Sequence, residues 1–288
     1  MSALEGRTIV VTGAAGGLGR AACAACLREG ASVFAVDAGT DPDGSGRDPS
    51  VVEALIDALV EEGHPRSRMA GAPLDVLADD GPETAFAAAE EAFGAIDGLV
   101  FAAGARHRRG VLKLDPTTLA APIRLGLESP LAWLGALARR WVGAKRGGSV
   151  VLFTSPSAFF GAQRQGAEAA AAAGIVAATR SAALELRRHG VRVNAVAATA
   201  HTRLTEDLPL FKNVKEGSLG AEHVAPLVVH LLSDAGEAIH GEVLGVAGTR
   251  VYALHARETT GAFAAEERFS VDEIGRRWAE ITRASRGR

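Results

Sequence analysis

The stretch VTGAAGGLGR (residues 11–20) decides the fold, because its glycines follow a short apolar run and open a helical one. Gly13 permits a tight turn, Gly17 lets the backbone approach a pyrophosphate, and Gly19 allows close packing of helix on sheet. A helix that begins here directs its free N–H groups toward an anion. The stretch therefore predicts a strand, a glycine-rich turn and a helix that together bind a dinucleotide.

Short β-branched runs alternate with longer Ala- and Leu-rich runs along the rest of the chain, which is typical of βαβ units. We expect strands at 7–12, 31–36, 68–74, 98–103, 149–154, 191–196 and 241–246. We expect helices at 17–29, 50–62, 81–93, 117–142, 163–189 and 221–233. The pattern predicts an α/β fold: a single Rossmann-like, doubly wound parallel sheet of about seven strands with helices on both faces.

The chain of 288 residues is long enough for one large domain, and it contains no internal repeat or linker. We predict a Rossmann domain over residues 1–250. Residues 251–288 are expected to be a C-terminal extension of the same domain. Within that extension, Ser270 and Glu273 have the spacing of a capping box, which predicts a terminal amphipathic helix.

Composition excludes several classes of partner. A net charge of −3 disfavours nucleic acid and anionic membrane surfaces as partners.

Cys23 and Cys26 have no second pair to complete a metal site, and the eight histidines lack metal-ligand spacing, so we expect buried thiols and no metal. The N-terminus shows no signal-peptide pattern, and no apolar run is expected to reach membrane-spanning length, which predicts a soluble cytoplasmic protein.

Two carboxylates follow the second and third expected strands. Asp37 is placed to accept hydrogen bonds from the adenosine ribose and to repel a 2′-phosphate, which favours NAD over NADP. The alternative is that Asp37 only caps the loop that follows it. Asp75 is placed to reach the adenine amino group, and a purely structural role for it is equally open.

The segment TGAAGGLG (residues 12–19) matches the TGxxxGxG motif of the short-chain dehydrogenase/reductase family. The expected order of strands along the chain is also similar to that of the family. Residues 221–234 and 257–282 are similar to the (3R)-hydroxyacyl-CoA dehydrogenase module of peroxisomal-type multifunctional β-oxidation enzymes. The resemblance implies an NAD site formed by Thr12, Gly13, Gly17, Leu18, Gly19, Asp37, Asp75, Val76, Ala103 and Gly104.

The resemblance also implies four catalytic side chains, and most of them are missing. The family uses a tyrosine as acid and base, a lysine four residues later, a serine thirteen residues before the tyrosine, and an asparagine in the preceding long helix. Ser155 supplies the serine. Glu168, Ala172 and Gly126 stand at the positions of the tyrosine, the lysine and the asparagine. The one tyrosine of the chain, Tyr252, lies near the C-terminus.

The departures extend around the nicotinamide end of the expected site. The family's Asn-Asn-Ala-Gly is FAAG here (residues 101–104), and its Pro-Gly is Ala198-Thr199. Pro130 cannot donate to the carbonyl of Gly126, which predicts a kink in the long helix. The losses therefore cluster at one end of the site, whereas the adenosine end keeps its residues.

Glu168 leaves two interpretations open. A carboxylate can accept a proton from an alcohol, but it is a poor proton donor near neutral pH. It is therefore either a relic or the base of an altered mechanism with Ser155, which has no nucleophile elbow of its own. The loop ARHRRG (residues 105–110) either meets phosphates of CoA or an acyl carrier, or is simply solvated.

Three hypotheses follow. The favoured one is a redox-inactive or crippled subunit that pairs with a complete dehydrogenase, and homodimers or homotetramers are the alternative assemblies. The Ala-rich helix QGAEAAAAAG (residues 165–174) is compatible with a subunit interface. The second is an active NAD-dependent enzyme on a 3-hydroxyacyl thioester or related alcohol, which uses Ser155 and Glu168. The third is a non-redox binder of acyl-CoA or another small molecule, or a lyase.

Overall fold

The computed structural model describes residues 2–212, 214–215 and 217–283. The chain divides into two compact units, Met1–Ala253 and Leu254–Arg288. The first contains the whole sheet and is treated first. The expectation that residues 251–288 belong to the same domain stays a prediction.

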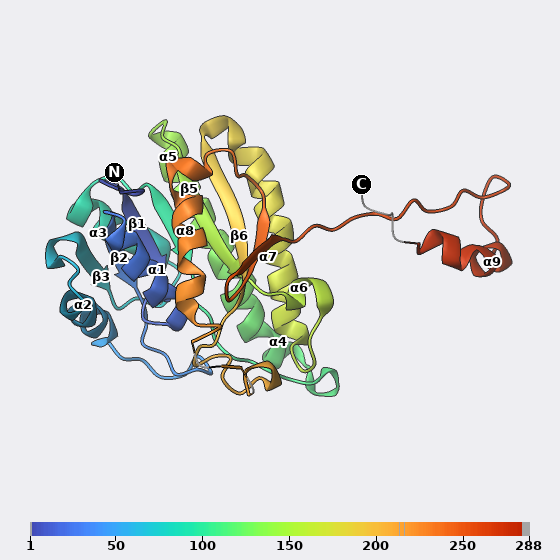
Figure 1. The fold of residues 1–288 in the computed structure, drawn as a ribbon, viewed down its shortest axis with the longest axis horizontal. Helices are drawn as coiled ribbons and strands as arrows, with labels where there is room; N and C mark the ends of the chain where they lie inside the picture. Colours follow the sequence, from blue (N-terminus) through green and yellow to red (C-terminus); the bar gives the residue numbers. More distant parts are fainter. Residues whose placement is uncertain (1, 213, 216, 284–288) are drawn as a thin grey trace. The chain divides into compact units, whose positions relative to one another are not determined.

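The first unit is built on one sheet, which confirms the predicted α/β class (Figure 1). Its strand order within the described residues is β3-β2-β1-β4-β5-β6-β7-β8, and all neighbours are parallel except β7 and β8. The strands are β1 (Thr8–Thr12), β2 (Ser32–Val36), β3 (Met69–Ala72), β4 (Gly98–Phe101), β5 (Gly148–Thr154), β6 (Val191–Thr199), β7 (Val243–Ala247) and β8 (Arg250–Ala253). The order reverses between β1 and β4, so the carboxyl ends of these strands flank the crevice where such folds bind ligands.

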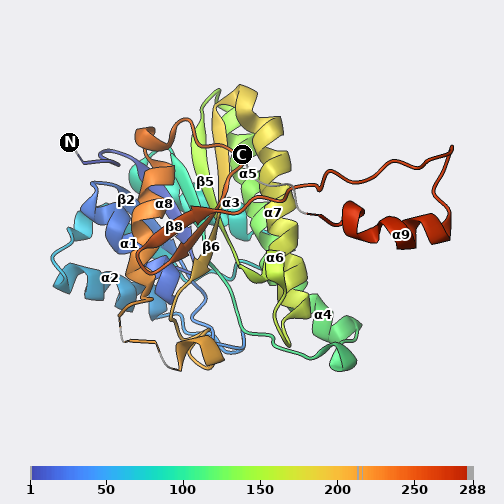
Figure 2. The same cartoon turned by 45° about the vertical axis from the view of Figure 1, so that its right-hand side comes forward.

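Helices cover both faces of the sheet, as predicted. They are α1 (Gly17–Arg28), α2 (Val51–Glu61), α3 (Gly81–Phe93), α4 (Pro116–Ile123), α5 (Ser129–Gly143), α6 (Ser157–Phe160), α7 (Gly166–Leu186) and α8 (Ala225–Leu232). Short 3-10 turns lie at Arg66–Arg68, Val111–Lys113, Arg187–His189, Pro209–Phe211, Ala221–His223 and Asp234–Gly236. Figure 2 shows α1 and α8 on one side of the strands and α5 and α7 on the other.

A cluster of three buried aromatic side chains packs in the core between α3, α5 and β4. Trp133 on α5 is fully buried and makes edge-on contacts with the rings of Phe86 and Phe101. Its indole N–H donates to the carbonyl of Val76 at 3.2 Å, and the hydroxyl of Ser129 donates to the same oxygen at 2.7 Å. These bonds fix the loop after β3, which forms one wall of the crevice.

The long helix expected over 117–142 is broken, as Pro130 predicts. Between α4 and α5 the residues Arg124–Glu128 form a π turn. Pro122 and Pro130 flank this turn, and each removes a backbone donor from the helical ladder, so a wider turn satisfies the carbonyls there. Gly126 lies within it.

The sequence prediction missed β8, and the sheet therefore has one more strand than the seven expected. Val251 and Tyr252 pair with Val246 and Gly245 in an antiparallel hairpin. Gly248, with φ 55°, makes the turn between the two strands. Three of the four residues of β8 are exposed, so its sequence lacks the continuous apolar run of the buried strands.

The expectation that no apolar run reaches membrane-spanning length is wrong. Residues 166–189, which comprise α7 and the turn after it, are long and apolar enough to cross a membrane by length and composition. A core helix of a soluble protein passes the same test, and α7 packs on β5 and β6 of the sheet. One of its faces is therefore already covered by the protein.

Both cysteines lie on α1 as free, fully buried thiols, as expected. Burial raises the pKa of Cys26 to about 12 and raises that of Cys23 further. These thiols therefore stay protonated at neutral pH and do not act as nucleophiles. Within the described residues, no group of three or more His, Cys, Asp or Glu side chains is placed to hold a metal ion.

The second unit contains the predicted amphipathic helix, α9 (Val271–Ile281). The Ser270 hydroxyl accepts the backbone N–H of Glu273 at 3.1 Å, which is half of the expected capping box. The Glu273 carboxylate instead accepts the N–H of Ala265 at 3.0 Å. Val271 and Trp278 remain exposed on this helix.

Candidate functional site

The glycine-rich turn has the predicted geometry. Gly13 follows β1 with φ 62°, and a Cβ there would lie 2.6 Å from the backbone of Ala103. A Cβ on Gly19 would lie 2.1 Å from the carbonyl oxygen of Gly13, and one on Gly17 would lie 2.8 Å from the Thr202 methyl group. α1 begins at Gly17 without a side-chain cap, so its first N–H groups remain available to an anion.

A cavity of about 110 Å³ opens beside this turn, at the carboxyl ends of β1, β2 and β4. It brings together eight of the predicted cofactor residues: Gly13, Gly17, Leu18, Asp37, Asp75, Val76, Ala103 and Gly104. The other two lie behind it. Gly19 packs against the turn itself, and Thr12 is fully buried with a hydroxyl that has no hydrogen-bond partner in the described protein. This lining fits the adenosine and pyrophosphate half of a dinucleotide.

Asp37 is buried and braces two loops as well as lining the cavity. One carboxylate oxygen accepts the N–H of Ala15 at 2.9 Å, and the other accepts the N–H of Gly39 at 2.8 Å. The capping role is therefore present, and the same carboxylate also contributes to the wall of the cavity. The preference for NAD over NADP stays a prediction.

Asp75 has a partner that the sequence prediction missed. Its carboxylate accepts the N–H of Leu77 at 3.0 Å and forms an ion pair with Arg47. Arg47 also lines the cavity, so a guanidinium lies in the same site as Asp37. Arg47 is the one cationic residue in the Gly-, Pro- and Asp-rich loop 39–50. That isolated positive charge was the sequence signal that could have identified Arg47 as a partner of Asp75. Contact of Asp75 with adenine stays a prediction.

A second, larger cleft of about 420 Å³ lies farther along the crevice. Ser155 and Glu168, the two predicted catalytic residues, both line it. Other parts of its wall come from the loop 105–110, from α6 and the loop after it, and from the end of β6 with the segment that follows. The structure thus brings Ser155 and Glu168 into one cavity.

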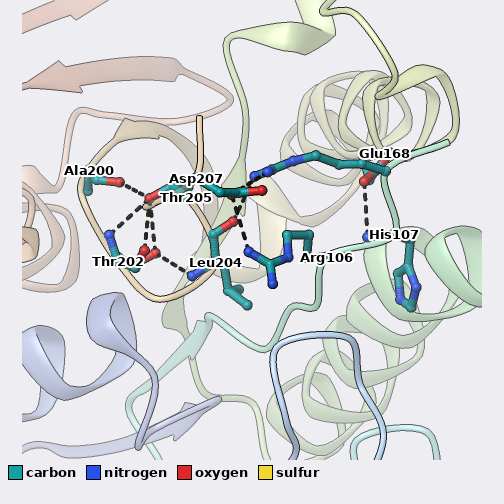
Figure 3. Close-up of polar contacts among 9 residues, drawn as sticks. Arg106, His107, Glu168, Ala200, Thr202, Leu204, Thr205 and Asp207 are labelled. Carbon is teal, nitrogen blue, oxygen red and sulfur yellow. Dashed lines mark hydrogen bonds and ion pairs between the residues drawn. The ribbon is translucent and has the colours of Figure 1, made fainter. Parts of the chain in front are cut away.

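Glu168 is used to hold a neighbouring loop. Its Oε1 accepts the backbone N–H of His107 at 3.2 Å, and Figure 3 shows the carboxylate directed at that nitrogen. Its Oε2 is buried and has no hydrogen-bond partner in the described protein. The hydroxyl of Ser155 accepts hydrogen bonds from the N–H of Ser157 at 3.2 Å and from its hydroxyl at 2.9 Å.

The other substituted positions offer no proton-transfer group. Ala172 is nearly buried, and its carbonyl accepts the Thr154 hydroxyl at 2.9 Å. Gly126 lies in the π turn, where a Cβ would meet that of Ala171 at 3.0 Å. Tyr252 lies on β8, and the Arg250 guanidinium is 4.5 Å from its ring centroid. It is absent from the described residues that line either cavity.

The arginine-rich loop is held against the segment after β6. Arg106 pairs with Oδ1 of Asp207 at 3.2 Å (Figure 3). Arg108 pairs with the same oxygen. Arg108 also donates to the carbonyl of Leu204 at 2.8 Å. The solvated-loop interpretation is wrong for these two arginines, whose side chains are only 30% and 16% exposed. Asp207 was missed, because nothing in its own segment indicates a partner 99 residues away.

The comparisons with known proteins agree with this geometry. The family model described as Enoyl-(Acyl carrier protein) reductase matches residues 13–248. The chain is also 34% identical to the putative short-chain type dehydrogenase/reductase Rv0148 of Mycobacterium tuberculosis, over 98% of this chain and 96% of that protein. The chain belongs to the short-chain dehydrogenase/reductase family.

Two further relatives narrow the resemblance within the short-chain dehydrogenases/reductases. The chain is 32% identical to the hydroxyacyl-CoA dehydrogenase ChsB1 of M. tuberculosis, over 93% of this chain and 84% of that protein. A crystal structure of a short-chain dehydrogenase from Mycobacterium avium superposes with a TM-score of 0.84 at 28% identity, covering 99% of this chain and 97% of that one. The predicted similarity to hydroxyacyl-CoA dehydrogenases is confirmed.

Proposed function

We propose that this short-chain dehydrogenase/reductase binds NAD(H) without transferring hydride efficiently, and that it serves as the non-catalytic member of an assembly with a complete dehydrogenase. One observation carries the proposal. At the position where the family resemblance places a tyrosine, the Glu168 carboxylate accepts the backbone N–H of His107 and so holds a loop.

The chemistry of hydride transfer supports this. Oxidation of an alcohol needs a group that accepts the hydroxyl proton, and reduction of a carbonyl needs one that donates it. Loss of a positioned acid or base lowers the rate by about 10²- to 10⁴-fold. Ala172 leaves no ammonium group four residues after Glu168 to hold the nicotinamide ribose. The residues of the cleft therefore fit ligand binding better than turnover.

The adenosine end supports retained cofactor binding. The glycine turn has no room for side chains, and the uncapped start of α1 faces the site. The buried Asp37 carboxylate supports NAD over NADP because it would repel a 2′-phosphate. Another relative, the L-rhamnose 1-dehydrogenase (NAD(P)(+)) of Azotobacter vinelandii, is 32% identical over 84% of this chain.

The assembly is supported by the outer face of α7. The helix packs one face on the sheet and also contacts α4, α6 and the π turn. Its exposed residues include several alanines and Leu184, which is 82% exposed. Small side chains let two such helices approach closely. The proposed partner is a family member that keeps the tyrosine and the lysine, with a homodimer or homotetramer as the competing outcome.

The test is native mass spectrometry of the chain co-expressed with complete dehydrogenases encoded by the same source. We expect a stoichiometric hetero-oligomer that Leu184→Asp dissociates. Leu112→Asp, at a fully exposed loop position, is the matched control and should leave the assembly intact. A stable homo-oligomer that never takes up a complete dehydrogenase would contradict the proposed role.

One observation favours a second candidate, an active enzyme of altered mechanism. The unpartnered Oε2 of Glu168 and the hydroxyl of Ser155 line the same cleft, so the carboxylate could act as a base toward an alcohol. This candidate predicts steady NADH production from a 3-hydroxyacyl thioester. The production must vanish in Glu168→Gln, which keeps the hydrogen bond to His107 but removes the base.

A further inference from the structure

Residues 109–113, with Arg164 beside them, form a surface segment that we call the basic turn. It lies between β4 and α4, and a bridge between Arg109 and Gln165 ties it to the start of α7. Figure 1 shows the segment that precedes α4 at the lower edge of the first unit. The basic turn lines a groove of about 540 Å³. Of the described residues that line this groove, Arg108 alone also lines the larger cleft.

The tip of the basic turn is apolar and stands in solvent. Leu112 is fully exposed, and Val111 is 76% exposed. The turn is held by its own backbone, because the N–H of Lys113 donates to the carbonyl of Gly110 at 2.8 Å and the N–H of Leu114 donates to the carbonyl of Val111 at 3.2 Å. One exposed apolar residue needs no explanation, whereas two adjacent ones on an ordered turn indicate a contact surface.

Cations surround this apolar tip. Arg109, Lys113 and Arg164 are exposed and line the same groove. Within the part of the chain that the structure describes, none of these three side chains forms an ion pair. Residues 105–114 include no acid and carry a charge of +4, although the whole chain carries −3. The net charge therefore conceals a local excess of positive charge, and it is this local charge that a nearby surface meets.

Arg164 is held beside the tip in an unfavourable backbone conformation. Its φ of 62° lies in the left-handed region, which is disfavoured for any residue with a Cβ. The turn around it is closed by Gln165, whose N–H donates to the carbonyl of Ala162 at 3.2 Å. Strained residues of this kind gather where a protein makes functional contacts. Here the strained residue adds a third cation to the groove.

This combination fits an anionic lipid surface better than a protein surface. A stable protein interface buries about 800 Å² on each partner, which is far more than a turn of three residues offers. A bilayer accepts a small projection, because apolar side chains enter the boundary of the acyl region while the charged ends of Arg and Lys stay at the headgroups.

We propose that the basic turn docks this protein on an anionic lipid surface. Val111 and Leu112 enter the acyl boundary, and the three surrounding cations contact headgroup phosphates. The attachment is reversible, since a few side chains bind far more weakly than a membrane-spanning helix. It is independent of the function proposed above, because neither hydride transfer nor the assembly through α7 uses these residues.

The test is co-sedimentation of the purified full-length chain with vesicles of phosphatidylcholine and phosphatidylglycerol in equal amounts, and with vesicles of phosphatidylcholine alone. We expect binding to the mixed vesicles only, and weaker binding as the salt concentration rises. Leu112→Asp should weaken binding by at least about 10-fold, because the apolar tip is lost and a carboxylate meets anionic headgroups. Arg109→Gln with Lys113→Gln should weaken it by about 25-fold, at about 5-fold for each cation.

Two controls make similar changes elsewhere on the chain. Arg139→Gln with Lys145→Gln removes two exposed cations at the end of α5, before β5 begins, and should leave vesicle binding unchanged. Trp278→Asp removes an exposed aromatic side chain from α9 and should also leave it unchanged. Melting temperatures show that each variant is folded.

Several outcomes would overturn the proposal. Normal vesicle binding by Leu112→Asp, or by the variant that lacks Arg109 and Lys113, removes the basic turn from the contact. Loss of binding in Trp278→Asp assigns the contact to α9 instead. Equal binding to both kinds of vesicle contradicts the role of charge. A chain that binds no vesicles but is retained on immobilised poly-glutamate through the basic turn docks an acidic protein, and the proposal is then wrong.

Discussion

The two ends of the crevice differ in what their residues are free to do. At the adenosine end, the glycine turn and the uncapped helix leave backbone donors available to a ligand. At the other end, Glu168 holds His107, and Asp207 holds Arg106 and Arg108. The side chains at this second end stabilise loops of the protein and are already engaged in contacts within it.

This difference shows that a scaffold and its chemistry are separable. The adenosine end depends on backbone geometry, which the packing of β1, α1 and β4 enforces. The chemical end depends on a few side chains that can change without loss of the fold. A family assignment therefore predicts the first end more securely than the second.

The largest effect is expected at the glycine turn. In Gly19→Ala the new methyl group would lie 2.1 Å from the carbonyl oxygen of Gly13, and the backbone must move. We expect NADH affinity to fall by about 100-fold, close to 2.7 kcal/mol. Isothermal titration measures this loss, and circular dichroism verifies the fold. Gly143→Ala, where a Cβ meets nothing within 4 Å, is the control and should bind NADH normally.

A smaller effect is expected from Asp37, the acid that is predicted to lie beside the adenosine ribose. Asp37→Ala removes the carboxylate and leaves Arg47 in the same cavity. We expect the ratio of NADH to NADPH affinity to fall by about 10-fold or more, because the repulsion of a 2′-phosphate disappears. Adding Arg47→Gln should cancel the gain in NADPH affinity. An unchanged ratio in Asp37→Ala would show that Asp37 only caps its loops.

A substitution at the other end of the crevice should change cofactor affinity very little. In Glu168→Gln the amide oxygen can still accept the N–H of His107, so the loop is retained. We expect NADH affinity to stay within about 2-fold of wild type, since one exchanged acceptor changes little. Fluorescence titration of NADH measures this. A tenfold loss would place Glu168 in the cofactor site and remove the contrast between the two ends.

The smallest effect is expected on the free energy of unfolding at acidic pH. Hydrogen bonding from Arg108 lowers the pKa of Asp207 below its ordinary value of 3.8. Its stabilising contribution is therefore complete above that pH and is lost as the pH falls through the lower folded-state value. The effect is small because the side chain is half exposed. Urea unfolding should show a slightly shallower loss below pH 3.8 in Asp207→Asn, and an identical slope would contradict the pairing.

Most of the fold was accessible from sequence, because the strands of a parallel sheet are continuous apolar runs. β1 and β4 are buried throughout, and their predicted positions agree with the structure within two residues. β8 was missed because an exposed edge strand lacks that pattern. The break near Gly126 followed from Pro130, although proline chemistry alone did not specify a π turn.

The candidate site was predictable in proportion to its dependence on local sequence. The glycine turn and Asp37 follow from spacing along one βαβ unit. The pairing of Arg108 with Asp207 joins residues 99 positions apart, and the bond from Glu168 to His107 spans 61. Such contacts depend on how loops from different strands meet at the sheet edge, which periodicity does not encode.

The central claim, retained NAD(H) binding without efficient hydride transfer, is tested most directly on one sample. NADH affinity is measured by titration, and NAD⁺ reduction is then followed at 340 nm with 3-hydroxyacyl thioesters of several chain lengths. We predict saturable NADH binding with no enzyme-dependent reduction above that of the Glu168→Gln variant. Multiple turnovers by the wild-type chain that Glu168→Gln abolishes would contradict the claim and establish Glu168 as a catalytic base.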